Sequence, residues 1–128
     1  MTDAKSAVEA AFYQALASSV TGATVYQDVP ENADLPIIIV GDMKSAPLGA
    51  KNDPDRRVSV LVVAMVAAEE RAPLLDLQRQ IEAALDGRVF TPTGWRLAVT
   101  FEDDDAQLAE DGVSYVGTSA FDVLALTT

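Results

Sequence analysis

Two long apolar segments, Leu35–Lys44 and Arg56–Val66, dominate the hydrophobic pattern of the chain. Arg56–Val66 is rich in β-branched residues and contains neither glycine nor proline, which predicts a strand. Both of its faces are apolar over Val60–Val66, whereas Arg57 and Ser59 mark a wetter face at its start. We therefore expect the middle of this strand to be covered on both sides, either because the sheet curls on itself or because that face meets another subunit.

Leu35–Lys44 has the same apolar character as far as Gly41 and Asp42, which predict a break or a β-bulge. Between the two apolar segments lies Ser45–Asp55, which contains two prolines and one glycine. This segment is too long for a two-residue hairpin turn. The pattern predicts two central antiparallel strands joined by a long, exposed loop.

Apolar residues recur at helical spacing in two further segments, Asp3–Ser19 and Ala68–Asp86. In the first segment a capping-box pattern begins at Ser6, so we expect the regular helix to begin there. In the second segment Pro73 is compatible with a helix only in its first turn. The second helix is therefore expected to begin close to Arg71.

Three more segments have strand patterns. Ala23–Val29 is a short strand candidate, and Trp95–Glu102 alternates apolar with polar residues, which predicts a half-buried strand. Gly112–Leu126 predicts a last strand, in which Gly117 is a candidate bulge. Asp103–Asp111 is expected to connect the last two strands as an exposed hairpin.

The order of elements is helix, strand, long hairpin, helix, hairpin, within a single domain that spans residues 1–128. The economical architecture for this order is α+β, with a mostly antiparallel sheet of four to five strands and two helices packed on one face. A chain of 128 residues can bury a substantial core, and its 49% of apolar residues argues against intrinsic disorder.

Residues that usually carry catalysis or bind metals are scarce. The chain contains no cysteine and no histidine, which removes thiol chemistry, the commonest general base and the commonest metal ligand. No glycine-rich dinucleotide motif, phosphate-binding loop or zinc-ligand spacing is present. We therefore expect no enzymatic activity, no cofactor and no metal. The first residues lack the pattern of a secretion signal, and no apolar run approaches the roughly 20 residues that span a bilayer, so a soluble protein without a membrane partner is expected.

The net charge is −11, and −6 of it comes from an acidic cluster that consists of Glu102, Asp103, Asp104, Asp105, Glu110 and Asp111. Clustered carboxylates are the ligands that a calcium site requires. The spacing fails the EF-hand pattern, however, because Leu108 stands where the loop glycine would be if Asp103 were the first ligand. We interpret the cluster as a solvated hairpin tip.

The loop between the two apolar segments is locally basic, because it carries or adjoins Lys44, Lys51, Arg56 and Arg57. Nucleic-acid binding would require more positive charge and interleaved aromatic residues. Two alternatives stay open. The arginines keep a strand edge soluble, or the basic loop of one subunit contacts the acidic cluster of its neighbour, a head-to-tail contact that closes into a ring. The candidate subunit or partner interface consists of Lys51, Arg56, Arg57, Asp103, Asp104, Asp105, Glu110 and Asp111.

Five segments that follow one another over most of the chain resemble one known family. They are AVEAAFYQALA, VYQDVPENADLPIIIVGD, LGAKNDPDRRVSVLVVAM, LLDLQRQIEAAL and GVSYVGTSAFDVLAL. In order and spacing they resemble the tail completion, or tail terminator, family of long-tailed bacteriophages, which also occurs in prophages and gene transfer agents. None of the five is a catalytic motif.

The resemblance implies a structural virion protein. Members of this family stop growth of the tail tube at its head-proximal end, as a ring that is typically a hexamer. The implied partners are other copies of the chain, the tail tube protein and the head-completion (stopper) protein, with DNA only in passage and no specific nucleic-acid binding. The implied location is the virion tail, after assembly in the host cytoplasm. The alternative, from another functional class, is an acidic binding module that mimics DNA and acts on a host partner.

Overall fold

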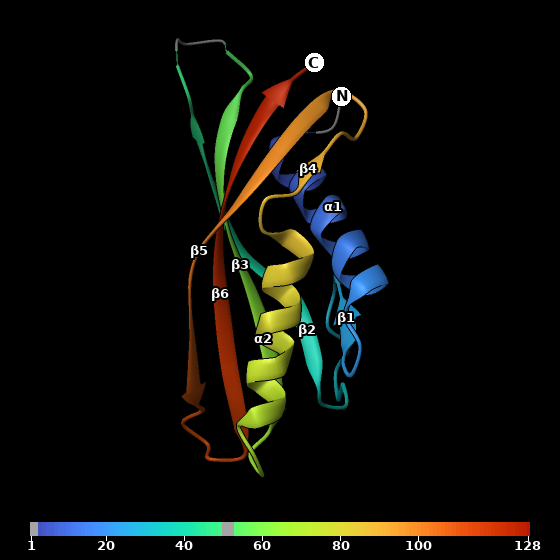
Figure 1. Cartoon of the computed structure of the whole chain (residues 1–128), viewed down its shortest axis with the longest axis vertical. Coiled ribbons are helices and arrows are strands. Elements are labelled where there is room, and N and C mark those ends of the chain that lie inside the picture. Colours follow the sequence, from blue (N-terminus) through green and yellow to red (C-terminus); the bar gives the residue numbers. More distant parts are fainter. Residues whose placement is uncertain (1–2, 50–52) are drawn as a thin grey trace.

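Two helices lie against one face of a single, strongly twisted sheet (Figure 1). The computed structural model describes residues 3–49 and 53–128. The helices are α1 (Ala4–Ser19) and α2 (Ala72–Leu85), and the strands are β1 (Thr24–Tyr26), β2 (Ile37–Pro47), β3 (Arg56–Ala67), β4 (Val89–Phe90), β5 (Trp95–Leu108) and β6 (Ser114–Thr127). The predicted α+β class is confirmed, and the sheet has six strands where the sequence predicts four to five.

The strand order is β1-β2-β3-β6-β5-β4, and every neighbouring pair is antiparallel except β1 with β2. The predicted antiparallel pairing of the two apolar segments is confirmed as β2 with β3. β6 pairs with the whole of β3, from Ala125 opposite Arg56 to Ser114 opposite Ala67. The centre of the sheet is therefore β3 with β6, because β6 inserts between β3 and β5.

The two outermost strands are short and cover only part of their neighbours. β1 pairs with the first residues of β2, as far as Ile39, and β4 pairs only with Leu97 and Ala98 of β5. The sequence does not predict β4, because a two-residue strand is too short to show a hydrophobic period. Within the described residues, the short outer strands leave long parts of β2 and β5 without a strand on their outer side.

The helices begin where packing places their first turns. α1 begins at Ala4, with Asp3 as its N-cap residue, so the prediction that regular helix begins at Ser6 is wrong. Ala4 is itself buried in the core, and burial of this first turn extends the helix beyond the capping-box pattern. α2 begins at Ala72 with a proline in its first turn, as the sequence predicts. Within the described ranges, neither helix combines the length and apolarity needed to cross a membrane.

The helix-covered face of β3 lies at the centre of the core. Val58, Val60 and Val62 are fully buried in one cluster with residues from both helices. On the opposite face Leu61 and Val63 are only half-buried. The sequence predicts that both faces of β3 are covered. Within one chain only the helix face is fully covered, and the side chains on the open face of the curled sheet remain partly exposed.

Two β-bulges bend the sheet. One lies at Gly41 and Asp42 in β2, where the sequence predicts it. The other lies in β5 between Phe101 and Asp103, and the sequence does not predict it. A bulge increases the local twist of the bulged strand, so both contribute to the curl of the sheet.

Gly117 is not bulged, and that candidate bulge is wrong, because the residue pairs in register with Ala64 on β3. The side chain of Gln78 lies directly above this position and explains why it is occupied by glycine. A Cβ at this position would lie 2.5 Å from Nε2 of Gln78 and 3.0 Å from Cδ1 of Leu74. Gln78 is buried, and its Nε2 donates a 2.6 Å hydrogen bond to the carbonyl oxygen of Asp105. Gly117 therefore makes room for an amide that ties α2 to β5.

The acidic segment is mainly strand rather than hairpin loop. β5 continues through residues 103–108, which pair with β6 from Ala120 back to Tyr115. The prediction that Asp103–Asp111 connects the last two strands is therefore wrong for its first six residues, and the connecting turn spans residues 109–113. Pairing with β6 and the hydrogen bond from Gln78 hold this charged stretch extended.

Candidate interaction surface

The basic and acidic groups predicted to form an interface lie toward opposite ends of the molecule. The β2–β3 loop projects from one end of the sheet, and the β5–β6 turn closes the other end (Figure 1). The register agrees with this view, because Arg57 lies opposite Leu124, late in β6, whereas Asp105 lies opposite Thr118, early in β6. The structure thus separates the two halves of the predicted interface within one chain.

Both arginines at the basic end are engaged by their own chain. Nη1 of Arg56 donates to the carbonyl oxygens of Asp53, at 2.6 Å, and of Asp55, at 2.9 Å, and so braces the end of the β2–β3 loop. Nε of Arg57 lies 3.6 Å from Oδ2 of Asp122 on the neighbouring strand β6. The hydrogen bonds occupy a donor group of Arg56, and the ion pair with Asp122 partly offsets the charge of Arg57, whose side chain is still 57% exposed.

Two lysines also belong to this end. Lys44 lies opposite Ser59, is exposed, and forms no ion pair with any residue that the structure describes. Lys51 lies outside the described residues. Lys44 is therefore better placed than Arg56 or Arg57 to form an ion pair with another molecule.

Asp55 fastens the base of the loop to the end of β6. Its Oδ1 accepts hydrogen bonds from the backbone N–H of Thr127, at 2.7 Å, and from Oγ1 of Thr127, at 2.9 Å. These two bonds, with the nearby charge of Arg56, hold the pKa of the Asp55 carboxyl below its usual value. The end of the loop that leads into β3 is thus held by two residues. Asp55 ties it to the end of β6, and Arg56 binds the loop backbone.

Replacing Asp55 by alanine is expected to lower the free energy of unfolding at pH 7. It should also make the free energy of unfolding vary less with pH in the acid range. Because the folded-state pKa is depressed, the stabilisation is present above the unfolded-state pKa of about 3.9 and is lost as pH falls through the folded-state value. Urea unfolding at neutral and acid pH measures this, with Asp34→Ala as the control because Asp34 is exposed and forms no hydrogen bond with a described residue. A difference between Asp55→Ala and the wild type that stays constant down to pH 2 would contradict the assignment.

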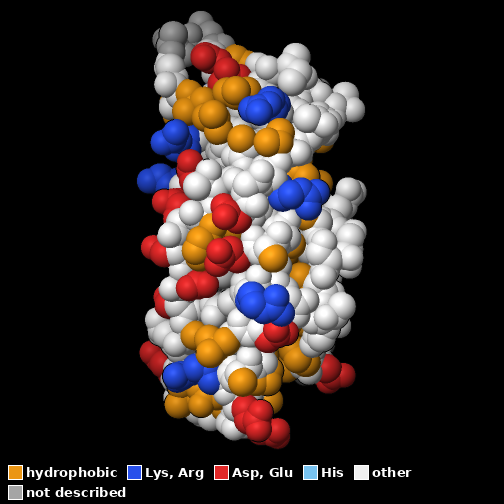
Figure 2. All heavy atoms as spheres, viewed as in Figure 1, with side chains coloured by type: hydrophobic (Ala, Val, Ile, Leu, Met, Phe, Trp, Pro, Cys, Tyr) orange, Lys and Arg blue, Asp and Glu red, His pale blue; other side chains and the backbone are white. Residues whose placement is uncertain are grey.

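The acidic cluster divides into an edge row and a turn pair. Glu102, Asp103, Asp104 and Asp105 are exposed on the second half of β5, and Figure 2 shows acidic side chains following that margin of the molecule. No cation among the described residues forms an ion pair with this edge row. Its solvated character agrees with the prediction, although its conformation is strand rather than hairpin tip.

The turn pair is Glu110 and Asp111. Oδ1 of Asp111 accepts a 2.9 Å hydrogen bond from the N–H of Val113, and Gly112 has a φ of +72°, so Asp111 shapes the turn. Within residues 3–49 and 53–128, no three carboxylates converge in a way that could hold a metal ion. The cluster is therefore best described as a charged edge with a charged turn beside it.

A shallow groove with a volume of about 570 Å³ separates α1 from residues 88–93. Its described lining includes Gln14, Ser18 and Arg88 but no carboxylate. The guanidinium of Arg88 lies 5.0 Å from the ring centroid of Phe90, a cation–π contact, and its Nη1 donates to the carbonyl oxygen of Ala84 at 3.4 Å. No acid–base pair is assembled among the described residues of this groove.

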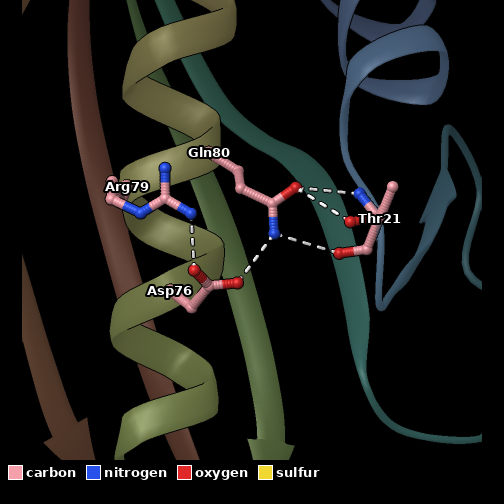
Figure 3. Close-up of polar contacts among 4 residues, drawn as sticks. All are labelled: Thr21, Asp76, Arg79 and Gln80. Carbon is pink, nitrogen blue, oxygen red and sulfur yellow. Dashed lines mark hydrogen bonds and ion pairs between the residues drawn. The ribbon is translucent and has the colours of Figure 1, made fainter.

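A polar network fixes the two helices relative to each other (Figure 3). The side-chain amide of Gln80 binds the backbone of Thr21 in both directions, because Oε1 accepts from the Thr21 N–H at 2.9 Å and Nε2 donates to its carbonyl oxygen at 3.1 Å. Asp76 accepts from Nε2 of Gln80 at 2.9 Å and from Nη2 of Arg79 at 2.6 Å. The bond from Arg79, and then that from Gln80, lowers the pKa of Asp76. These contacts fix the segment that follows α1 to α2, and none of them involves a sheet edge.

Two free sheet edges are the feature that sequence reasoning missed. From Val40 to Pro47 on β2, and from Glu102 to Leu108 on β5, no described strand pairs on the outer side. Toward the start of β5, hydrogen bonds from residues 86–88 cover the edge as far as Phe101. A proline and a run of acids are typical of exposed edges, so Pro47 and the edge row were the available signals.

Comparison with known proteins supports the fold. No family model matches this sequence, and no curated protein matches it significantly. Among solved structures, a chain of the "Virion of native gene transfer agent (GTA) particle" is similar to this protein, with a TM-score of 0.83 and 19% sequence identity. The match covers 94% of this chain and 95% of that chain. The two chains therefore share their fold from end to end.

Proposed function

We propose that this protein is the tail terminator of a long-tailed phage, a prophage or a gene transfer agent. In this role copies of the chain form a ring, a hexamer as the family resemblance implies, at the head-proximal end of the virion tail. One side of the ring contacts the last layer of the tail tube protein, and the other side contacts the head-completion (stopper) protein. DNA passes through the ring without sequence-specific contacts, and assembly takes place in the host cytoplasm.

The fold shared with a chain of a gene transfer agent virion, over almost the full length of both, carries this proposal. The resemblance of five sequence segments to tail terminators points toward the same kind of particle. A net charge of −11 fits a protein that lets DNA pass without holding it.

The separation of opposite charges supports a head-to-tail ring. A heterologous contact joins two different surfaces of the same chain, and it closes into a ring when the rotation between neighbours divides a full turn. The interface predicted from the sequence consists of Lys51, which lies outside the described residues, with Arg56 and Arg57 on one side, and of Asp103, Asp104, Asp105, Glu110 and Asp111 on the other. Its described basic and acidic residues lie on different parts of the sheet, which is compatible with a heterologous contact.

Deleting the gene from a particle-producing cell tests the proposal. We expect electron microscopy to show heads that lack tails, together with tail tubes of uncontrolled length, and a plasmid copy of the gene should restore normal particles. Light scattering of the purified protein is the companion measurement, with a species of six times the 13.6 kDa of one chain expected at high concentration. Normal numbers of tailed particles with normal tail length in the deletion strain would refute the proposal.

The edge row favours a second candidate, an acidic module that mimics DNA. In a strand, side chains two residues apart share a face, so Asp103 and Asp105 are about 7 Å apart and the four-residue row is about 10 Å long. A mimic needs carboxylates over a longer track to compete with a DNA duplex. The row is therefore a weaker basis for function than the shared virion fold, and specific capture of a host DNA-binding protein would revive it.

A further inference from the structure

We infer that neighbouring subunits of the ring are joined by a continuous sheet, in which the free edge of β2 in one copy pairs with the free edge of β5 in the next. The partner of both edges is thus a second copy of this chain. This inference deepens the proposed function and rests on it, because it specifies the subunit contact of that ring.

Both edges offer backbone groups that no described strand pairs, and the two free stretches are of similar length. The free part of β2 runs from Val40 to Pro47, and the free part of β5 runs from Glu102 to Leu108. Strands of this length with open N–H and C=O groups are templates for pairing with another chain. Lys44 on the first edge and the edge row on the second are exposed, so the edges are accessible.

The directions of the strands suit head-to-tail pairing. β2 is antiparallel to β3, β3 to β6 and β6 to β5, so β2 and β5 run in opposite directions within one copy. Around a ring all copies have the same orientation relative to the axis. The β2 of one copy therefore meets the β5 of its neighbour in an antiparallel arrangement, which a two-stranded ladder can accommodate directly.

The positions of the free edges match the stagger of a closed sheet. Lys44 is level, across the sheet, with Ser59, Asp122 and Thr100, whereas the free edge of β5 is centred near Asp105. If Lys44 of one copy lies beside Asp105 of the next, each copy is shifted relative to its neighbour by about 15 Å along the strand direction. The four strands β2, β3, β6 and β5 of each copy span about 19 Å across the sheet. That ratio corresponds to a strand tilt of about 38°, within the 35–45° that closed barrels adopt.

Charge complementarity favours this pairing over the pairing of two β5 edges. Lys44 lies opposite Ser59, and Asp105 lies opposite Thr118, which in turn faces Val63; Ser59 and Val63 are on the same, open face of β3. A Lys44 side chain placed opposite Asp105 of the neighbour is therefore on the same face and forms a cross-strand ion pair. Two β5 edges would instead bring acids against acids and repel each other.

Disulfide trapping tests the pairing, and the absence of cysteine in the chain gives a clean background. Copies carrying Lys44→Cys and copies carrying Asp105→Cys, with tags of different size, are mixed and oxidised, both as purified protein and in assembled particles. Opposed strand residues have Cβ atoms about 4.5–5.5 Å apart, close to disulfide distance. We expect a crosslinked dimer that contains both tags, at a yield on the order of tenfold above a control mixture of Lys44→Cys with Thr100→Cys. Thr100 is an exposed residue on the same strand, but the covered part of β5 places it away from the pairing edge.

The outcomes separate this inference from the proposed function. Rings or terminated tails that form normally, with a Lys44–Asp105 crosslink no stronger than the control, would overturn edge pairing and leave the terminator role standing. A strong crosslink in a strain whose tails are normal without the gene would support the edge contact and refute the role. As a second readout, Lys44→Asp should weaken assembly and Lys44→Asp with Asp105→Lys should restore it; unchanged assembly in the single variant would count against the ion pair and the pairing it fixes.

Discussion

Replacing Phe121 with alanine is expected to lower the free energy of unfolding by about 3–5 kcal/mol, a large part of the 5–15 kcal/mol that stabilises a typical domain. Phe121 is fully buried at the centre of β6. Its ring centroid lies 5.8 Å from that of Phe12 in α1 and 5.5 Å from that of Phe101 in β5, with edge-to-face geometry in both pairs. Removing the ring therefore leaves a cavity where a helix and two strands meet.

Urea unfolding followed by circular dichroism measures this loss. The matched control is Leu124→Ala, which shortens a half-buried side chain of the same strand on the open face. We expect the control to cost clearly less, because solvent already reaches that side chain and fills part of the space it leaves. Equal losses in the two variants would mean that the open face is as well covered as the helix face, as it would be in a stable oligomer. Repeating the comparison at several protein concentrations separates that case from an error in the core assignment.

Replacing Gly117 with valine is expected to cost about 2–4 kcal/mol, the sum of overpacking and of the lost hydrogen bond beneath α2. Any Cβ at this position meets Nε2 of Gln78 at 2.5 Å and Cδ of the same side chain at 2.8 Å. Gln78 is buried and cannot move aside without releasing the carbonyl oxygen of Asp105. The substitution should therefore also loosen the second half of β5, where the edge row lies.

A double-mutant cycle isolates this cause. Gln78→Ala removes the side chain that clashes, so the cost of Gly117→Val should fall in that background and the two effects should not add. Thr118→Val is the control on the same strand, because Thr118 is half-buried on the open face and away from α2. Full additivity of Gly117→Val and Gln78→Ala would show that Gln78 is not the reason for glycine at this position.

The sequence predicts which residues of the candidate interface are charged, but it predicts little of how their side chains are arranged in space. The basic loop and the acidic cluster stand out in the printed chain because each is a local excess of one sign. The charge pattern does not indicate that Arg56 donates hydrogen bonds to its own loop. Nor does it indicate that Arg57 forms an ion pair with Asp122, because these two residues are far apart in sequence. Which cation stays available, Lys44, is decided only when β2, β3 and β6 are placed side by side.

The sequence by itself determined the elements with a strong local signal: the helical period of both helices, the β-branched apolar runs of β2 and β3, the alternating start of β5, and the last strand β6. Side-chain periodicity is a local property, so a window of neighbouring residues is enough to detect it. Only the tertiary structure decided that α1 begins at Ala4, that β4 exists, that β5 continues through the acids, and that Gly117 accommodates Gln78. Each of these depends on contacts with another element of the fold, whose packing or hydrogen bonds outweigh the weak local preference. The free edges belong to the same group, because an edge is defined by which strand is not beside it.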